Sequence, residues 1–275
     1  MMQPKAAIND FVIKFANVNG TGSASANGMF AKAIFRMGIP VSPRNIFPSN
    51  IQGLPTWYEV RISQDGYLGR RGGIDMMVSV NPQSFAKDVG EVEPGGYMLY
   101  DSTKPLDLRH VRRDIHYLGI PLTEMCLREY TDSRQRQLFK NVIYVGALSA
   151  LLNIDFSILK DLVSEQFKGK EKLITPNIHA LEMGHQYAST HFECPLGIHL
   201  KAGEQTPKHI QEFDQILMDG NTATALGAVY AGATVAAWYP ITPSTSVVDA
   251  FEKYCRRLRI DPGSGCRIRQ QAAQP

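Results

Sequence analysis

The sequence predicts an α/β fold, and three observations support this prediction. An apolar run over Phe11–Ala16 is followed by a glycine turn and then by apolar residues at helical spacing, which is the order of a strand–turn–helix unit. Short apolar runs and helical patterns keep alternating up to residue 100, as in proteins with a parallel or mixed sheet covered on both faces. Hydrophobic residues make up 44% and charged residues 20% of the 275 residues, which is the composition of a globular protein.

The first half of the chain carries the strands. The turn Asn19–Ser23 opens a helix over Ala24–Met37, whose apolar face would lie on the sheet. The alternating run Trp57–Ile62 predicts a strand with one solvated face, and the nearly continuous apolar run Ile74–Val80 predicts a central strand. A short helix and a further strand follow, over Pro82–Val89 and Tyr97–Tyr100.

The chain then becomes mainly helical. Apolar residues recur at helical spacing over residues 138–152, and a second helix over Phe156–Phe167 has Asp155 or Ser157 as its cap. A third helix covers Ile178–Ser189. These helices predict a helical extension of the first α/β unit.

The polar, turn-rich segment Gly197–Lys208 predicts a connector, after which a second α/β unit begins. A helix over Thr222–Ala231 leads into a buried strand over Thr234–Tyr239, and another helix covers Ser246–Arg257. Residues 220–248 carry no formal charge, but they are rich in Ala, Gly and Thr and contain two prolines. They therefore predict a buried helix, strand and turn rather than a membrane span.

Charge, cysteine spacing and the amino terminus exclude several classes of protein. With 29 Lys+Arg and 26 Asp+Glu the net charge is +3, which is unlike the concentrated basic surface of a nucleic-acid-binding protein. The four cysteines form no CxxC pair, which argues against a zinc ribbon or a cysteine-ligated iron–sulfur cluster in this chain and fits a reducing compartment. The start MMQPKAAINDF has no apolar signal-peptide core, so we expect a cytoplasmic protein.

The glycine turn is a candidate anion site. Asn19, Gly20, Thr21, Gly22 and Ser23 place backbone N–H groups and hydroxyls at a helix N-terminus, which attracts negative groups. The spacing is not G-x-G-x-x-G, and no acidic residue follows about twenty residues later, so the pattern does not favour a nicotinamide dinucleotide. A plain tight turn and a phosphate or carboxylate contact both remain open.

Histidines and arginine pairs are weaker candidates. His179, Glu182 and His185 would drift around a helix rather than converge on a metal, and no HExxH pattern occurs, so we expect no metal site. The pair Arg70–Arg71 lies between turn glycines, where a solvated loop is favoured over an anion contact.

The string Trp238–Ser244 is the most specific local signal. Pro240 and Pro243 stiffen a loop at the carboxyl end of the predicted strand, which is the edge where open α/β sheets bind ligands. Thr242 lies between them and can donate a hydrogen bond to a carboxylate. The alternative is a structural loop in which Thr242 or Ser244 only caps the next helix.

This string and its surroundings resemble the 2-oxoacid:ferredoxin oxidoreductases, thiamine-diphosphate enzymes, in the branch that acts on 2-oxoglutarate. The segments Gly220–Gly232 and Tyr239–Ser244 are similar to the start of the alpha subunit. The strings Asn45–Ser63 and Gly72–Asn81 are similar to the gamma domain that is fused ahead of the alpha domain in many members. The resemblance runs from residue 10 to residue 262.

The resemblance implies a particular domain order and site. It implies a gamma-type α/β domain with a helical extension over residues 10–200 and a linker over 201–218. An incomplete start of a thiamine-diphosphate-binding, pyrimidine-type α/β domain would cover 219–262, followed by a non-matching tail over 263–275. The family's threonine contact with the 2-oxoacid transfers to Thr242. The other residues of the substrate loop would be Tyr239, Pro240, Ile241, Pro243 and Ser244.

The resemblance also implies a reaction and partners. A 2-oxoacid, expected to be 2-oxoglutarate, would be oxidatively decarboxylated with coenzyme A to an acyl-CoA, carbon dioxide and reduced ferredoxin. A beta subunit would bind thiamine diphosphate through Mg²⁺, and iron–sulfur clusters would lie on partner chains only. No nucleic acid and no membrane enter this scheme.

Two departures from the family pattern keep other interpretations open. Gamma domains often carry Gly-x-Gly-Gly-Gln-Gly where this chain has Val18–Ser23, so the resemblance does not assign a ligand to this turn. After Pro262 the sequence GSGCRIRQQAAQP no longer matches and lacks the glutamate that hydrogen-bonds the aminopyrimidine in the family, so we expect a truncated chain or a shifted reading frame. A non-catalytic subunit acting in assembly or binding and a free-standing nucleotide-binding module are the alternatives.

Overall fold

The computed structural model describes residues 3–46, 53–202, 215–239, 241 and 244–259. The chain divides into two units, residues 1–214 and residues 215–275. Within the described ranges, no helix combines the length and the apolar character needed to cross a lipid bilayer.

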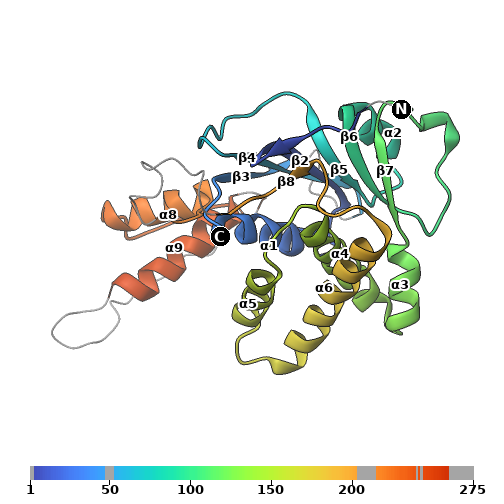
Figure 1. The fold of residues 1–275 in the computed structure, drawn as a ribbon. Helices are drawn as coiled ribbons and strands as arrows, with labels where there is room; N and C mark the ends of the chain where they lie inside the picture. Colours follow the sequence, from blue (N-terminus) through green and yellow to red (C-terminus); the bar gives the residue numbers. More distant parts are fainter. Residues whose placement is uncertain (1–2, 47–52, 203–214, 240, 242–243, 260–275) are drawn as a thin grey trace. The chain divides into compact units, whose positions relative to one another are not determined.

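A mixed six-stranded sheet forms the centre of the first unit (Figure 1). Its order is β3-β4-β2-β5-β6-β7, in which β2, β5, β6 and β7 run parallel and β4 pairs antiparallel with both β2 and β3. The parallel strands therefore end at one edge, where α/β sheets form ligand sites. The strands are β2 (Asp10–Val18), β3 (Val41–Ile46), β4 (Pro55–Ser63), β5 (Ile74–Ser79), β6 (Val92–Asp101) and β7 (His116–Ile120).

Helices cover the two faces of this sheet unequally, as Figure 1 shows. One face carries the large core with α1, α4, α5 and α6, and the other carries α2. A short parallel pair, β1 with β8, ties the start of the chain to the segment after α6. The remaining elements are β1 (Ala7–Ile8), α1 (Ser23–Arg36), α2 (Phe85–Glu91), η1 (Leu108–His110), α3 (Leu122–Glu129), α4 (Ser133–Leu151), α5 (Phe156–Gln166), α6 (Glu171–His191) and β8 (Ile198–His199).

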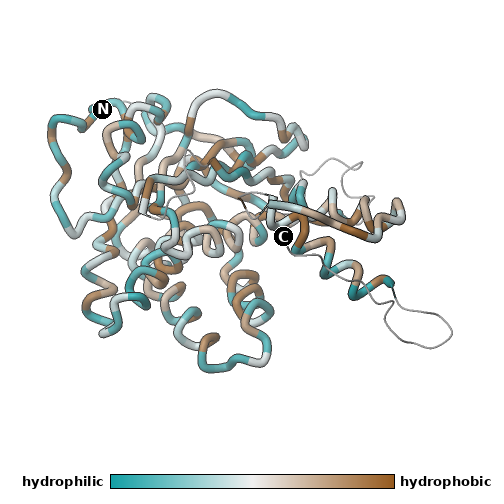
Figure 2. Tube along the Cα trace, turned by 180° about the vertical axis from the view of Figure 1, so that it is seen from behind, coloured by the Kyte–Doolittle hydropathy of each residue, from teal (hydrophilic) through white to brown (hydrophobic). Residues whose placement is uncertain are grey.

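Strand β2 lies in the middle of the core and is covered on both faces. Phe11, Ile13 and Phe15 point to the face covered by α1 and α4, whereas Val12 and Ala16 point to the face of α2. Successive side chains of a strand alternate between faces, so a strand covered on both sides is mostly apolar. Its buried polar residues have partners: Lys14 forms an ion pair with Glu91, and Asn17 accepts a hydrogen bond from Asn27 at 2.9 Å. Figure 2 shows the resulting hydrophobic colours along the strands of the sheet.

Strand β4 corrects one expectation from the sequence. The run Trp57–Ile62 is a strand, but the expected solvated face is wrong because Glu59 is buried along with its neighbours. Glu59 lies opposite the buried Lys14 of β2, and the Arg70 guanidinium approaches it at 3.8 Å. The polar position in this alternating run is therefore buried rather than in contact with water, and the ion pair of Lys14 is formed with Glu91 of α2.

Several boundaries also differ from the sequence prediction. The short helix expected over Pro82–Val89 is α2, which starts later, and the helix expected over Ile178–Ser189 is α6, which starts seven residues earlier at Glu171. The first residues of the expected connector belong to the core, since Ile198 and Leu200 are fully buried. The sequence did not predict the burial of these two residues, because the segment around them is polar and rich in turn residues.

The crossing of α4 and α6 depends on two glycines. A Cβ at Gly146 would lie 2.0 Å from the carbonyl oxygen of Leu181, and a Cβ at Gly184 would lie 1.9 Å from the carbonyl oxygen of Ile143. Because these obstacles are backbone atoms, the helices can approach this closely only where both residues lack a side chain.

The described part of the second unit contains two packed helices, α8 (Gly220–Tyr230) and α9 (Thr245–Leu258). Asp219 caps α8 by accepting a hydrogen bond from the backbone N–H of Thr222 at 2.9 Å. The expected buried strand over Thr234–Tyr239 is wrong, because this segment is not a strand and Val235 is 67% exposed. A strand needs a neighbour for its backbone groups, and the described part of this unit contains none.

Candidate functional site

The glycine turn lies at the carboxyl end of β2 and opens α1. Gly20 and Gly22 have φ angles of +83° and +79°, a left-handed conformation that favours glycine. Gly22 is the N-cap of α1 and provides no side chain, and the first turn of the helix carries no acidic residue. The helix N-terminus therefore presents its positive end without a charged or hydroxyl cap from the preceding residue.

One face of α4 holds this turn in place. The Asn141 amide donates a hydrogen bond to the carbonyl oxygen of Thr21 at 2.9 Å, and Asn141 is itself buried. One turn earlier on the helix, Leu138 packs so closely that a Cβ at Gly22 would lie 2.4 Å from its Cδ2. One turn later, the Tyr144 hydroxyl donates to the side-chain Oδ1 of Asn27 at 2.6 Å. The backbone of the turn is thus fixed from outside by residues far away in the sequence.

A cavity of about 210 Å³ opens beside the turn. Its walls include Ser23, Asn27, Trp57 and Tyr58, together with the turn itself. Ser23 is 6% exposed, and its hydroxyl has no hydrogen-bond partner among the residues that the structure describes. Burial raises the pKa of Tyr58 to about 12, so its phenol stays neutral and can donate. The cavity therefore combines hydroxyl donors with an open helix N-terminus.

A buried carboxylate fixes the aromatic wall of this cavity. Asp88 on α2 is fully buried and accepts hydrogen bonds from Trp57 Nε1 at 2.8 Å, Ser84 Oγ at 2.8 Å and Ser79 Oγ at 3.0 Å. Burial raises the pKa of Asp88, and these three donors offset that effect only in part. Lys87 lies over the Trp57 ring, 4.2 Å from its centroid. The indole is therefore held at its N–H and at its face.

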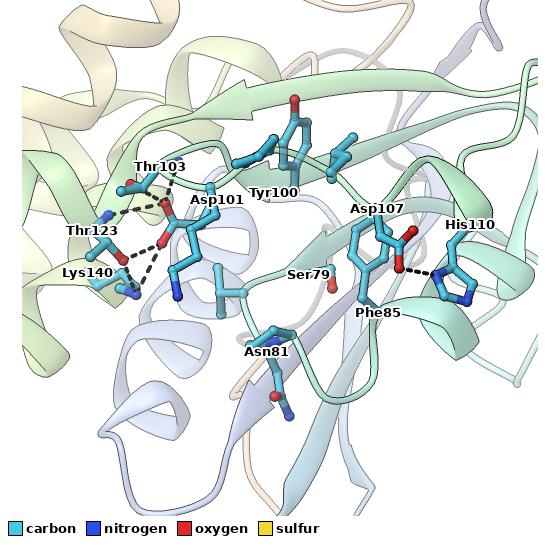
Figure 3. Close-up of a pocket in the computed structure, with 15 residues that line it drawn as sticks. Ser79, Asn81, Phe85, Tyr100, Asp101, Thr103, Asp107, His110, Thr123 and Lys140 are labelled. Atoms are coloured by element: carbon cyan, nitrogen blue, oxygen red, sulfur yellow. Dashed lines mark hydrogen bonds and ion pairs between the residues drawn. The ribbon is translucent and has the colours of Figure 1, made fainter.

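A larger cavity, of about 500 Å³, lies at the ends of β5 and β6 (Figure 3). It extends from a polar group of side chains around Asp101 and Lys140 to a second group around Phe85 and His110, with Ser79 and Asn81 between them, as Figure 3 shows. Ser79 also donates to Asp88, so the same carboxylate contacts a wall of each cavity.

Asp101 organises the polar end of the larger cavity. It accepts hydrogen bonds from Thr103 Oγ1 at 2.7 Å and from the Thr123 backbone N–H at 3.2 Å, and it pairs with Lys140 at 3.2 Å. Burial alone would raise the pKa of Asp101, but the bonds from Thr123 and Thr103 and the charge of Lys140 outweigh it and lower the pKa. Asp101 is therefore an ionised, fully satisfied carboxylate that also caps α3.

The loop residues singled out from the sequence lie in the second unit. Tyr239 and Ile241 are exposed, and the Ser244 hydroxyl donates to the carbonyl oxygen of Ile241 at 2.7 Å, at the start of α9. Pro240, Thr242 and Pro243 lie outside the described residues.

His179, His185 and Arg71, which the sequence analysis considered as ligand-binding candidates, contact other side chains of the chain. His185 Nδ1 lies 2.8 Å from Ser149 Oγ, and burial lowers the pKa of His185. His179 Nε2 lies 2.9 Å from a carboxylate oxygen of Glu129. Arg71 forms an ion pair with the buried Asp75. The described residues contain no group of three His, Cys, Asp or Glu side chains that could hold a metal ion.

Comparison with known proteins places this geometry in a family. The model of the pyruvate ferredoxin/flavodoxin oxidoreductase family matches residues 12–187, which include the sheet, the turn and both cavities' principal walls. The chain belongs to this family. A curated relative is the alpha subunit of 2-oxoacid:ferredoxin oxidoreductase 2 from Aeropyrum pernix, which is 25% identical over 89% of this chain and 43% of its own length.

Solved structures show the same fold. The 2-oxoglutarate:ferredoxin oxidoreductase from Magnetococcus marinus, solved with 2-oxoglutarate, coenzyme A and succinyl-CoA bound, superposes with a TM-score of 0.76 at 25% identity over 90% of this chain and 42% of that one. The gamma subunit of a keto/oxoacid ferredoxin oxidoreductase from Geobacter sulfurreducens superposes with a TM-score of 0.51 at 20% identity, over 66% of this chain and 99% of that one. The chain thus spans less than half the length of its alpha-type relatives and has the mixed α/β fold of the family.

Proposed function

We propose that this family member acts as an alpha-type subunit of a 2-oxoacid:ferredoxin oxidoreductase, with 2-oxoglutarate as its 2-oxoacid. The observation that supports this proposal is the extent of the similarity, because the alpha-type relatives match about nine-tenths of the chain, across both units. In this proposal residues 10–200 are the gamma-type domain, and residues 219–262 are the start of the pyrimidine-binding domain. The reaction converts the 2-oxoacid and coenzyme A into an acyl-CoA and carbon dioxide and reduces ferredoxin.

The turn at the start of α1 fits an anionic group of coenzyme A. The helix N-terminus is uncapped, its first turn has no acidic residue, and the buried Ser23 hydroxyl lacks a protein partner among the described residues. We assign the backbone N–H groups of Gly22 and Ser23 and the Ser23 hydroxyl to hold a phosphate, because such groups satisfy anions at helix N-termini. Asn141 keeps the turn in the required conformation through its bond to Thr21.

The described part of the second unit offers no enclosed carboxylate to an aminopyrimidine. Asp219 caps α8, Glu252 forms an ion pair with Arg256, and these two and Asp249 are all exposed. We therefore assign thiamine diphosphate and Mg²⁺ to a site completed by a beta subunit, with iron–sulfur clusters on partner chains. Isothermal titration of the purified chain with Mg²⁺ and thiamine diphosphate should show no micromolar binding.

Thr242 is the proposed contact to the 2-oxoacid. In the complex with a beta subunit, Thr242→Ala should lower kcat/KM for the 2-oxoacid about ten- to hundredfold, because a charge-assisted hydrogen bond contributes about 1.5–3 kcal/mol. Thr242→Ser keeps the hydroxyl and should retain most of the activity. Equal activity of Thr242→Ala and the parent would contradict this role and indicate that the loop is only structural.

The decisive experiment is reconstitution. The chain is co-expressed with a beta subunit of the same enzyme class, and reduction of ferredoxin is followed with 2-oxoglutarate and coenzyme A present or omitted. Reduction that needs both substrates supports the proposal. A stable complex without turnover would instead indicate a non-catalytic role in assembly, and the absence of a complex would favour a free-standing ligand-binding module.

A further inference from the structure

The larger cavity has no role in the function proposed above, although it lies at the ligand-binding edge of the sheet. It measures about 500 Å³, which lies within the usual range of roughly 300–1,000 Å³ for small-molecule sites. Residues at the ends of β5 and β6 line it, and none of its lining residues belongs to the glycine turn. The chemistry of its walls indicates the kind of ligand it takes.

The four formally charged side chains that line this cavity balance, but the two lysines, Lys104 and Lys140, face only Asp101 at the polar end, while Asp107 lies near Phe85 and His110. Asp101 is neutralised by Lys140, and the exposed Asp107 is paired with Arg109 at 2.6 Å. Lys104 also lines the cavity, and no hydrogen bond or ion pair is recorded for it in the described part of the chain. Lys104 therefore faces the cavity without an ion-pair partner among the described residues.

Lys140 adds a donor beside this charge. Its ammonium group bonds to Thr123 Oγ1 at 2.6 Å and to Asp101 at 3.2 Å. An ammonium group has three protons, so one remains for a ligand. Because Thr123 and Asp101 hold Lys140 in place, this donor is pre-oriented, which lowers the entropic cost of binding.

The rest of the wall is largely apolar. Pro82 lies just before α2, and Phe85 is the first residue of that helix. Pro105 and Leu106 come from the loop after β6. Figure 3 places Phe85 at the end of the cavity away from Lys140, near His110 and Asp107. A ligand that fills the cavity must therefore present an anionic group to one end and an apolar, ring-like body to the other.

We propose that this cavity binds an organic anion of about mononucleotide size, with its charged group against Lys104 and Lys140 and its planar body against Phe85. A phosphorylated nucleoside and an aromatic carboxylate share this chemistry. Binding should weaken as salt is added, because Lys104 lies at the surface, where charges are screened.

The test uses the purified 275-residue chain with ADP, benzoate and inorganic phosphate as separate probes in isothermal titration. We expect ADP or benzoate to bind more tightly than phosphate, and the tighter of the two identifies the source of the anion. Phosphate binding as tightly as both would overturn the part of the proposal that concerns the planar body. A lack of binding by all three probes at millimolar concentration would overturn the whole proposal.

Matched lysine variants locate the site. Lys104→Glu should weaken binding of the preferred probe about five- to tenfold, because it removes one surface attraction and adds a repulsion. Lys168→Glu reverses an exposed lysine outside the cavity and should leave the affinity unchanged. The bound probe should also protect Lys104, but not Lys168, from acetylation in the parent chain. Equal effects of the two substitutions, or equal acetylation of Lys104 with and without the probe, would place the ligand elsewhere, for example at the glycine turn.

Discussion

At the scale of single residues, two carboxyl groups at one edge of the sheet, the partly buried Asp101 and the fully buried Asp88, differ in their chemistry. Asp101 receives an ammonium group besides hydroxyl and amide donors, and its pKa is lowered. Asp88 receives three neutral donors and lies in a fully buried position, and its pKa is raised. The difference follows from the fuller burial of Asp88, which its three neutral donors offset only in part, whereas Asp101 is partly exposed and its hydroxyl donors act together with the charge of Lys140.

The raised pKa of Asp88 has a consequence for the pH dependence of stability. The folded chain binds this proton more tightly than the unfolded chain, so the stabilisation is fully present below the unfolded pKa, about 3.9, and is lost as pH rises through the folded pKa. Asp88→Asn cannot ionise and still offers an acceptor to Trp57. We expect the free energy of unfolding of this variant, relative to the parent, to increase as pH rises from 4 to 7.

Urea unfolding at several pH values checks this prediction, and Asp107→Asn is its control. Hydrogen bonds from Arg109 lower the pKa of the exposed Asp107 to about 2, so this group contributes stability that is present above its unfolded pKa and lost in acid. The relative stability of Asp107→Asn should therefore change in the opposite direction. A difference between Asp88→Asn and the parent that stays constant with pH would contradict the assignment of a raised pKa.

At the scale of the elements, the crossing of α4 and α6 is the most sensitive contact. Gly184→Ala would place a methyl group on the carbonyl oxygen of Ile143, and relief requires the two helices to separate. We expect a loss of about 1–3 kcal/mol in the free energy of unfolding, as for other overpacked cores. Gly28→Ala on α1 has open space at its Cβ and should stabilise by up to about 1 kcal/mol, measured by the same urea titration. Stabilisation by both alanines would mean that the helices cross less closely.

How far the elements could be predicted depends on how local their causes are. Strand β2 and helix α1 follow from apolar periodicity and turn residues, and the structure confirms them. Of the two caps predicted for α5, Asp155 and Ser157, the structure shows Asp155. Strands β3 and β7 were missed, because Val41–Ile46 contains a proline and charge and His116–Ile120 is short. They are strands only because a neighbour supplies their hydrogen bonds.

The residues of the candidate site also differ in how far the sequence alone predicts them. The glycine turn is visible in the sequence because a backbone with positive φ needs glycine. Asn141, Lys140 and Asp88 could not be found this way, because their partners lie at distant positions or on other elements and a single asparagine or lysine in a helix carries no spacing signal. The indication that the sequence offered for Asn141 and Lys140 is that they are polar residues in the mainly apolar run of α4.

At the scale of the whole molecule, each unit has a core of its own. The two large apolar clusters contain residues from Phe11 to Leu200, whereas the small cluster contains Ala225, Val229, Phe251 and Cys255. We expect residues 1–214 expressed alone to unfold cooperatively at nearly the midpoint of the full chain. Residues 215–275 alone should show no cooperative transition, because two helices bury too little apolar surface. Calorimetry of both pieces checks this, and a marked fall in the midpoint of the first piece would contradict it.

The position of Trp57 gives the protein an optical property. The chain has two tryptophans, Trp57 in the first unit and Trp238 in the second. Trp238→Phe therefore leaves Trp57 as the single tryptophan. That indole borders the cavity at the glycine turn, and its N–H is bonded to the Asp88 carboxylate. Fluorescence of this variant would therefore report directly on occupancy of the turn and on the protonation of Asp88, without any added label.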